Sequence, residues 1–109
     1  MIKSIVLFKR TPGMSVKEFQ RYWREEHPKV VTALAGIRRY VQNHPTESAY
    51  ANGREPDYDG VAEVWWDDWD ALRASGRSTE WQAVAADEAN FIDPNSRRLL
   101  VTEEHVIVE

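Results

Sequence analysis

The chain contains no cysteine, so disulfide bonds and thiolate metal ligands are excluded. No apolar run approaches the ~20 residues that a membrane-spanning helix needs. Lysine and arginine never stand more than two in a row and the net charge is −4, which argues against a nucleic-acid surface. A glycine-rich phosphate loop and paired histidines at metal-ligand spacing are both missing. Neither a nucleotide cofactor nor a metal is therefore expected.

The first ten residues lack the small-residue cleavage site of a signal peptide, so we expect a cytoplasmic protein. A length of 109 residues is enough for one core, and residues 1–109 are expected to form a single domain. Tryptophan, in contrast to cysteine, is abundant, with five residues. These side chains fit either a bulky core or the wall of an apolar pocket, and both can hold together.

Hydrophobic patterns predict four strands and three helical segments. Branched and aromatic residues indicate strands over 2–9, 37–43, 60–66 and 97–108. A capping box and an apolar stripe indicate a long first helix over about 15–35, and two further helical segments are expected over 68–76 and 78–91. Residues 45–58 have the composition of a loop.

The order of these elements is β-α-β-β-α-β, which is typical of a ferredoxin-like α+β domain. Such a domain has a four-stranded antiparallel sheet with its helices on one face. The opposite face is then left uncovered, and an apolar sheet face in water is a sticky surface. A second copy of the chain is the simplest cover, so we expect a homodimer that pairs through the open sheet face.

His27 is the first candidate catalytic residue. It falls in the apolar stripe of the long helix, one turn after Trp23, and directly precedes Pro28. Proline disfavours helical geometry in the preceding residue, so the helix should kink or restart at His27. Burial favours a neutral imidazole and nearby helix carbonyls favour a charged one, a balance that suits a general acid or base. The alternative is a core histidine that anchors the kink.

The strand over 37–43 supplies the second candidate, His44. Two-residue alternation places Tyr40, Gln42 and His44 on one face, where they could line a polar patch in a cleft or face solvent at a strand end. His105, in the last predicted strand, fits a surface position or a dimer contact better.

Two carboxylates fall at apolar positions. Glu88 lies within the apolar stripe of the last helix, where it must be ion-paired, have a raised pKa or point into a wet cavity. Glu63 alternates with Val61 and Trp65 in the third strand, and a cross-strand partner such as Arg39 or Arg97 is expected for it.

Several motifs together resemble the EthD family. They are Phe8-Lys9-Arg10, Tyr22-Trp23-Arg24-Glu25-Glu26-His27-Pro28, Arg39-Tyr40-Val41-Gln42-Asn43-His44, Tyr58 to Trp66, and Ala86 to Asp93. The resemblance implies a dimeric α+β barrel, a superfamily that also includes polyketide cyclases, muconolactone isomerases and haem-degrading or quinone-forming monooxygenases. It carries over His27 and His44 as the family's histidine positions.

Three functions follow from the residues and the resemblance. The first is a cofactor-free enzyme acting on a small aromatic, polyketide-like or lactone compound by isomerisation, cyclisation, dehydration or decarboxylation. In it His27 moves a proton, His44 with Tyr40 binds the oxyanion, and Trp23, Trp66, Phe91 and Glu88 complete the substrate site. The second is a non-catalytic protein that binds a hydrophobic metabolite for an oxygenase, as in ethyl tert-butyl ether breakdown. The third is a haem-binding or cofactor-free monooxygenase.

Overall fold

The computed structural model describes residues 1–109 and contains one four-stranded sheet with four α-helices. The strands are β1 (Ile2–Phe8), β2 (Arg39–Asn43), β3 (Gly60–Trp66) and β4 (Arg98–Thr102). The α-helices are α1 (Val16–Glu25), α2 (Pro28–Val31), α3 (Trp69–Gly76) and α4 (Thr79–Glu88). Two 3-10 segments, η1 (Glu47–Gly53) and η2 (Pro94–Ser96), complete the structure.

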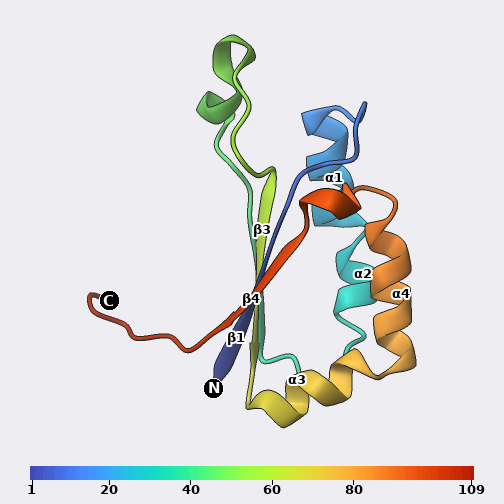
Figure 1. The fold of residues 1–109 in the computed structure, drawn as a ribbon, viewed down its shortest axis with the longest axis vertical. Helices are drawn as coiled ribbons and strands as arrows, with labels where there is room; N and C mark the ends of the chain where they lie inside the picture. The colour runs from blue at the N-terminus through green and yellow to red at the C-terminus, as the bar shows by residue number, and fades with distance from the viewer.

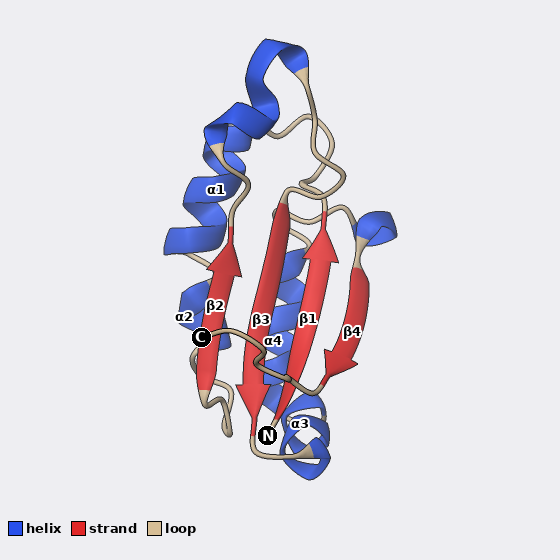
Figure 2. Ribbon diagram, turned by 90° about the vertical axis from the view of Figure 1, so that its left-hand side faces the viewer, coloured by secondary structure: helices blue, strands red, loops and turns tan.

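The sheet has the order β2-β3-β1-β4, and every neighbouring pair is antiparallel. Figure 1 shows the sheet edge-on with the four α-helices on one side, and Figure 2 shows its uncovered face. The predicted ferredoxin-like α+β fold is therefore confirmed. None of the helices combines the length and the apolar character needed to cross a membrane.

The first helical stretch divides in two at His27, as its Pro28 predicts. Ser15 caps α1 by accepting a hydrogen bond from the backbone N–H of Glu18. At the other end, the N–H groups of both Glu26 and His27 donate to the carbonyl of Tyr22, which widens the last turn. Pro28 then occupies the first turn of α2, where its missing N–H costs nothing. This break turns the His27 side chain into the protein interior.

Two predicted boundaries at the carboxyl-terminal end are wrong. The last strand ends at Thr102 instead of Val108. Thr102 pairs with Lys3, and β1 begins only one residue before Lys3, so it offers almost no further strand to pair with. His105 therefore lies outside the sheet and is exposed. The helix predicted over 78–91 ends at Glu88, because the N–H groups of Asn90 and Phe91 donate to carbonyls only three residues earlier, those of Asp87 and Glu88, in place of the α-helical four.

The core consists of two apolar clusters on the helix side of the sheet. One comprises Ile2, Val31, Leu34, Trp66 and Val84, and the other comprises Phe8, Phe19, Trp23, Phe91 and Ile92. Along β1 and β3 the two clusters are separated by shorter side chains, namely Ser4, Val6, Ala62 and Val64. These residues leave the middle of the layer between sheet and helices incompletely filled.

The opposite face of the sheet carries charged and apolar side chains. Lys3 forms an ion pair with Glu63 at 2.7 Å. The prediction that Arg39 or Arg97 would pair with Glu63 is therefore wrong. Arg39 lies instead over the ring of Trp65, with its guanidinium carbon 4.6 Å from the ring centroid. Leu100, a neighbour of these residues on the same face, is 56% exposed. No helix covers this face.

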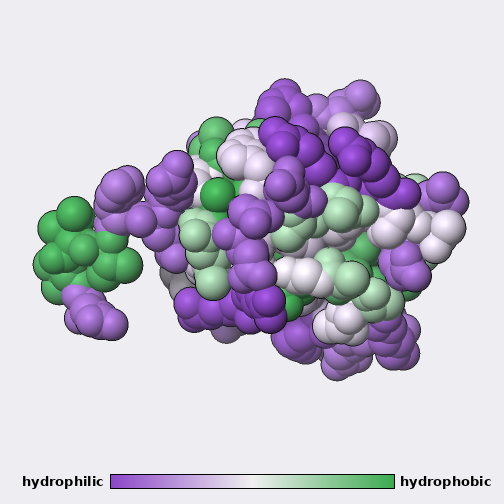
Figure 3. All heavy atoms as spheres, turned by 90° about the horizontal axis from the view of Figure 1, so that it is seen from below, coloured by the Kyte–Doolittle hydropathy of each residue, from purple (hydrophilic) through white to green (hydrophobic).

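The carboxyl-terminal segment, residues 103–109, forms an arm on the open side of the sheet. Glu104 accepts a hydrogen bond of 2.6 Å from Nε1 of Trp65, which directs the chain across the face. Beyond it Val106, Ile107 and Val108 are 69%, 88% and 88% exposed. Figure 3 shows the apolar end of this arm standing away from the body of the molecule.

Candidate active site

A cavity of about 340 Å³ lies between the sheet and the helices. Its walls are mostly apolar, and a few polar side chains enter it. Six of the seven residues that the sequence singles out line it: His27, Tyr40, Trp23, Trp66, Phe91 and Glu88. Its volume is in the range of small-molecule sites, which are typically about 300–1,000 Å³. Exposed Trp69 and Leu99 on its rim place its mouth between α3 and β4.

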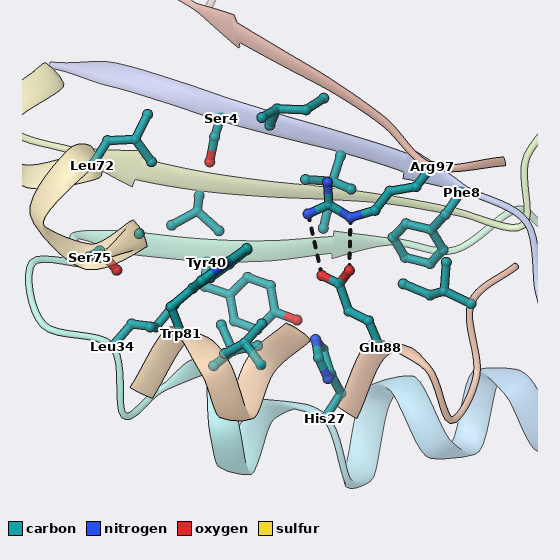
Figure 4. A pocket seen from close by; sticks show the side chains of 18 of the residues that line it. Ser4, Phe8, His27, Leu34, Tyr40, Leu72, Ser75, Trp81, Glu88 and Arg97 are labelled. Atoms are coloured by element: carbon teal, nitrogen blue, oxygen red, sulfur yellow. Dashed lines mark hydrogen bonds and ion pairs between the residues drawn. The ribbon is translucent and has the colours of Figure 1, made fainter. Parts of the chain in front are cut away.

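His27 is held against Asp87 of α4. Its Nδ1 lies 2.7 Å from Oδ2 of Asp87, and its ring contacts Phe91 edge-on with 4.7 Å between the ring centroids. A carboxylate accepts hydrogen bonds, so this contact favours the tautomer with its proton on Nδ1. The other nitrogen, Nε2, has no hydrogen-bond partner in the chain, and the imidazole points toward the cavity (Figure 4). The pair therefore presents a basic nitrogen to any bound molecule.

Asp87 is organised as an anion. Burial raises its pKa, but hydrogen bonds from Tyr22, His27 and Asn90 outweigh burial and lower the pKa below its usual value. A carboxylate that stays ionised both orients the imidazole and stabilises the imidazolium that forms when Nε2 takes a proton. Three side chains from two distant segments, Tyr22, Asp87 and Asn90, thus hold the His27 ring in place.

Tyr40 supplies a hydrogen-bond donor to the same cavity. Its Oη accepts a hydrogen bond of 2.9 Å from Nε2 of Gln42, which leaves the phenolic proton free to donate. Burial raises the pKa of Tyr40, so the phenol remains protonated at neutral pH. A half-buried, protonated phenol of this kind is suited to stabilising a negative oxygen.

His44 does not line the cavity, and the structure does not bring the two histidines together there. Its ring packs against Trp23 with 4.3 Å between centroids, and its Nε2 lies 2.8 Å from Oε1 of Gln42. Burial, together with the nearby charge of Arg24, lowers the pKa of His44 and favours the neutral ring. His44 therefore reaches the cavity only indirectly, since it orients Gln42, which binds Tyr40.

Glu88 and Arg97 form an ion pair beside the cavity. The Nε atom of Arg97 lies 2.8 Å from Oε1 of Glu88, and both side chains are largely buried. Of the three environments that the sequence allowed for Glu88, this is the ion pair. It joins the end of α4 to the chain that leads into β4, and so closes one end of the cavity (Figure 4).

Sequence reasoning missed Asp87 as a site residue, although a signal for it exists. Asp87 and Glu88 both occupy the last turn of α4, which contains no basic residue. Negative charge is unfavourable at a helix carboxyl end, where the helix dipole is itself negative. Two acids placed there need partners from elsewhere in the chain, and His27 and Arg97 are those partners.

The family model of the EthD domain matches residues 11–95. The chain belongs to the EthD family. The matched segment contains His27, Tyr40, Asp87 and Glu88, so most of the candidate site lies within the EthD domain. No curated protein sequence matches the chain.

Solved structures show the same fold at low sequence identity. An EthD family protein from Bacillus halodurans C-125 is similar with a TM-score of 0.77 and 20% identity, over 96% of this chain and 99% of that one. A dimeric ferredoxin-like protein from Bacteroides fragilis has a TM-score of 0.68 and 18% identity, over 94% and 95%. SnoaB, a cofactor-independent oxygenase from Streptomyces nogalater, has a TM-score of 0.67 and 15% identity, over 99% and 97%.

Proposed function

We propose that this EthD domain is a cofactor-free enzyme that moves a proton at a carbon next to a carbonyl group in a small aromatic or polyketide-like molecule. The observation that carries the proposal is the His27–Asp87 pair, whose free Nε2 faces an apolar cavity. A base that is positioned by a carboxylate and shielded from bulk water is the arrangement general-base catalysis requires.

In the proposed reaction the side chains of the cavity act one after another. Nε2 of His27 takes a proton from the carbon, the electron pair of the broken C–H bond forms a C=C bond to the carbonyl carbon, and the π pair of the carbonyl moves onto its oxygen to give an enolate. The phenolic proton of Tyr40 donates a hydrogen bond to that oxygen. The imidazolium then returns its proton to the same carbon or to another, which gives exchange or isomerisation. Trp23, Trp66 and Phe91 exclude water from the enolate.

A ketone with acidic benzylic protons, 2-tetralone, tests the proposal. In heavy water the protein should accelerate deuterium incorporation at C1, because Nε2 takes a proton from C1 and returns a deuteron from solvent. Proton NMR measures the loss of the C1 signal, and buffer without protein gives the background rate. A protein that binds the ketone but exchanges it no faster than buffer would be a binding protein, in keeping with the accessory role.

We also propose that two copies pair through the open sheet face. Three observations support this pairing: the uncovered face, the exposed Leu100 on it, and the apolar arm over 106–108 on the same side. The dimeric description of the Bacteroides fragilis protein of the same fold agrees with it. The arm is the element that would reach across to the second copy.

Leu100→Arg tests the pairing, because it puts a charge in the middle of the proposed interface. Sedimentation equilibrium should show the wild type as a dimer and the variant with at least tenfold weaker association. Ala83→Arg adds the same charge to an exposed position on α4, on the helix side, and should leave the dimer intact. If Leu100→Arg self-associates as strongly as the wild type and Ala83→Arg do, the proposed interface is wrong.

A further inference from the structure

The cavity has a second polar end that the proposed reaction does not use. Figure 4 shows Ser75 of α3 and Ser4 of β1 at the end opposite to Glu88 and Arg97. Ser4 and Phe8 mark the two ends along β1, and four residues of strand span about 13 Å. A ligand that fills the cavity along this direction therefore meets polar groups at both of its ends.

Ser75 is a buried hydroxyl without a partner. It is 5% exposed and lines the cavity, yet its Oγ makes no hydrogen bond in the chain. Its own carbonyl is fully occupied, since the N–H and the hydroxyl of Ser78 both donate to it. Buried hydroxyls in folded proteins almost always have a partner, because leaving one unpaired costs stability. Alanine at this position would avoid that cost.

Ser4 offers a second hydroxyl at the same end. Its Oγ accepts a hydrogen bond of 3.1 Å from Nε1 of Trp66, so its own proton remains available to a ligand. Ser4 comes from the sheet and Ser75 from α3, so the two hydroxyls enter from different walls (Figure 4). Each hydroxyl can donate a hydrogen bond to an oxygen atom at this end of a bound ligand.

We infer that Ser75, together with Ser4, forms a subsite for a hydroxyl or carbonyl oxygen at the end of the ligand distant from the reacting carbon. The inference rests on the proposed function for the identity of the reacting end. It narrows the substrate class to flat, mostly apolar ketones with a second oxygen at the far end of the ring system. Ser75 is a specificity-determining residue in this assignment and takes no part in the proton transfer.

Two matched ketones test the subsite by binding alone. They are 2-tetralone and 6-hydroxy-2-tetralone, which carries a hydroxyl at the end of the bicyclic ring opposite to the carbonyl. Quenching of tryptophan fluorescence reports binding, because Trp81 lines the cavity. The wild type should bind the hydroxylated ketone about 5- to 10-fold more tightly, the effect of one net hydrogen bond. Ser75→Ala should remove this preference and leave the affinity for 2-tetralone within twofold.

Ser48→Ala is the matched control, since Ser48 is an exposed serine in η1, and it should keep the full preference. Ser4→Ala is the poorer variant, because it would also leave Nε1 of Trp66 without a partner. An equal preference in Ser75→Ala and wild type, or none in the wild type, would overturn the subsite. Failure of both ketones to bind would overturn the ligand class. Binding with the expected preference but without deuterium exchange would overturn only the proposed reaction.

Discussion

Replacing His27 with glutamine should lower the rate of deuterium exchange into 2-tetralone by about 10²–10⁴-fold, the usual contribution of a positioned base. Glutamine can still donate an amide N–H to Asp87, so the partner carboxylate is not left unpaired. It has no basic nitrogen at the position of Nε2, and the proton therefore has no acceptor. Initial exchange rates at saturating ketone measure the effect.

His105→Gln is the control for this variant, because it makes the same chemical change at an exposed position outside the cavity. It should exchange the ketone at the wild-type rate. Melting temperatures of both variants should stay close to that of the wild type. A His27→Gln protein that keeps activity within threefold, or that loses activity only in proportion to its loss of folded protein, would show that His27 is a core residue.

Replacing Gly60 with alanine should destabilise the protein by about 1–3 kcal/mol, the usual cost of overpacking a core. A Cβ at this position would lie 2.7 Å from Cε2 of Phe8 and 2.7 Å from Cζ3 of Trp23. Both rings are among the most deeply buried side chains of the protein, so neither can move without disturbing its neighbours. Urea denaturation at a fixed protein concentration measures the free energy of unfolding.

Gly76→Ala should change the free energy of unfolding in the opposite direction to Gly60→Ala. Apart from its chain neighbours and the backbone of its own helix, no atom lies within 4 Å of a Cβ built on Gly76, the last residue of α3. Alanine is favoured over glycine in a helix by about 0.8–1 kcal/mol, so this variant should be as stable as the wild type or more so. A Gly60→Ala protein within 0.5 kcal/mol of the wild type would mean that Trp23 and Phe8 shift freely, contrary to the packing described.

Patterns within single elements predicted much of this structure. The steps of four residues from Phe19 through Trp23 to His27 placed the histidine on the buried side, and Pro28 predicted the break that turns it inward. Alternation in β2 correctly put Tyr40, Gln42 and His44 on one face, where a chain of hydrogen bonds joins them. These features are local, because each depends on residues that lie close together in the sequence.

The cavity itself could not be predicted, because it is made by what two strands and a helix leave unfilled. Ser4 and Ala62 are unremarkable in sequence, and only the register of β1 against β3 places them between two aromatic clusters. The partnership of His27 with Asp87 joins positions 60 residues apart. Which histidine reaches the cavity is likewise decided by how α1 packs on the sheet, and no periodicity contains that information.

The strand order has a consequence for how the protein is made. β1 is synthesised before the other three strands but lies inside the sheet, and one of its partners, β4, is the last of the four strands to be made. The hydroxyl of Thr102 donates to the carbonyl of Lys3 across a separation of 99 residues. Contacts this distant in sequence slow folding, and until they form β1 has an unpaired edge that other chains can join. We therefore expect nascent chains that lack β4 to be the aggregation-prone species, and the cavity to gain its last wall only when synthesis of the domain is complete.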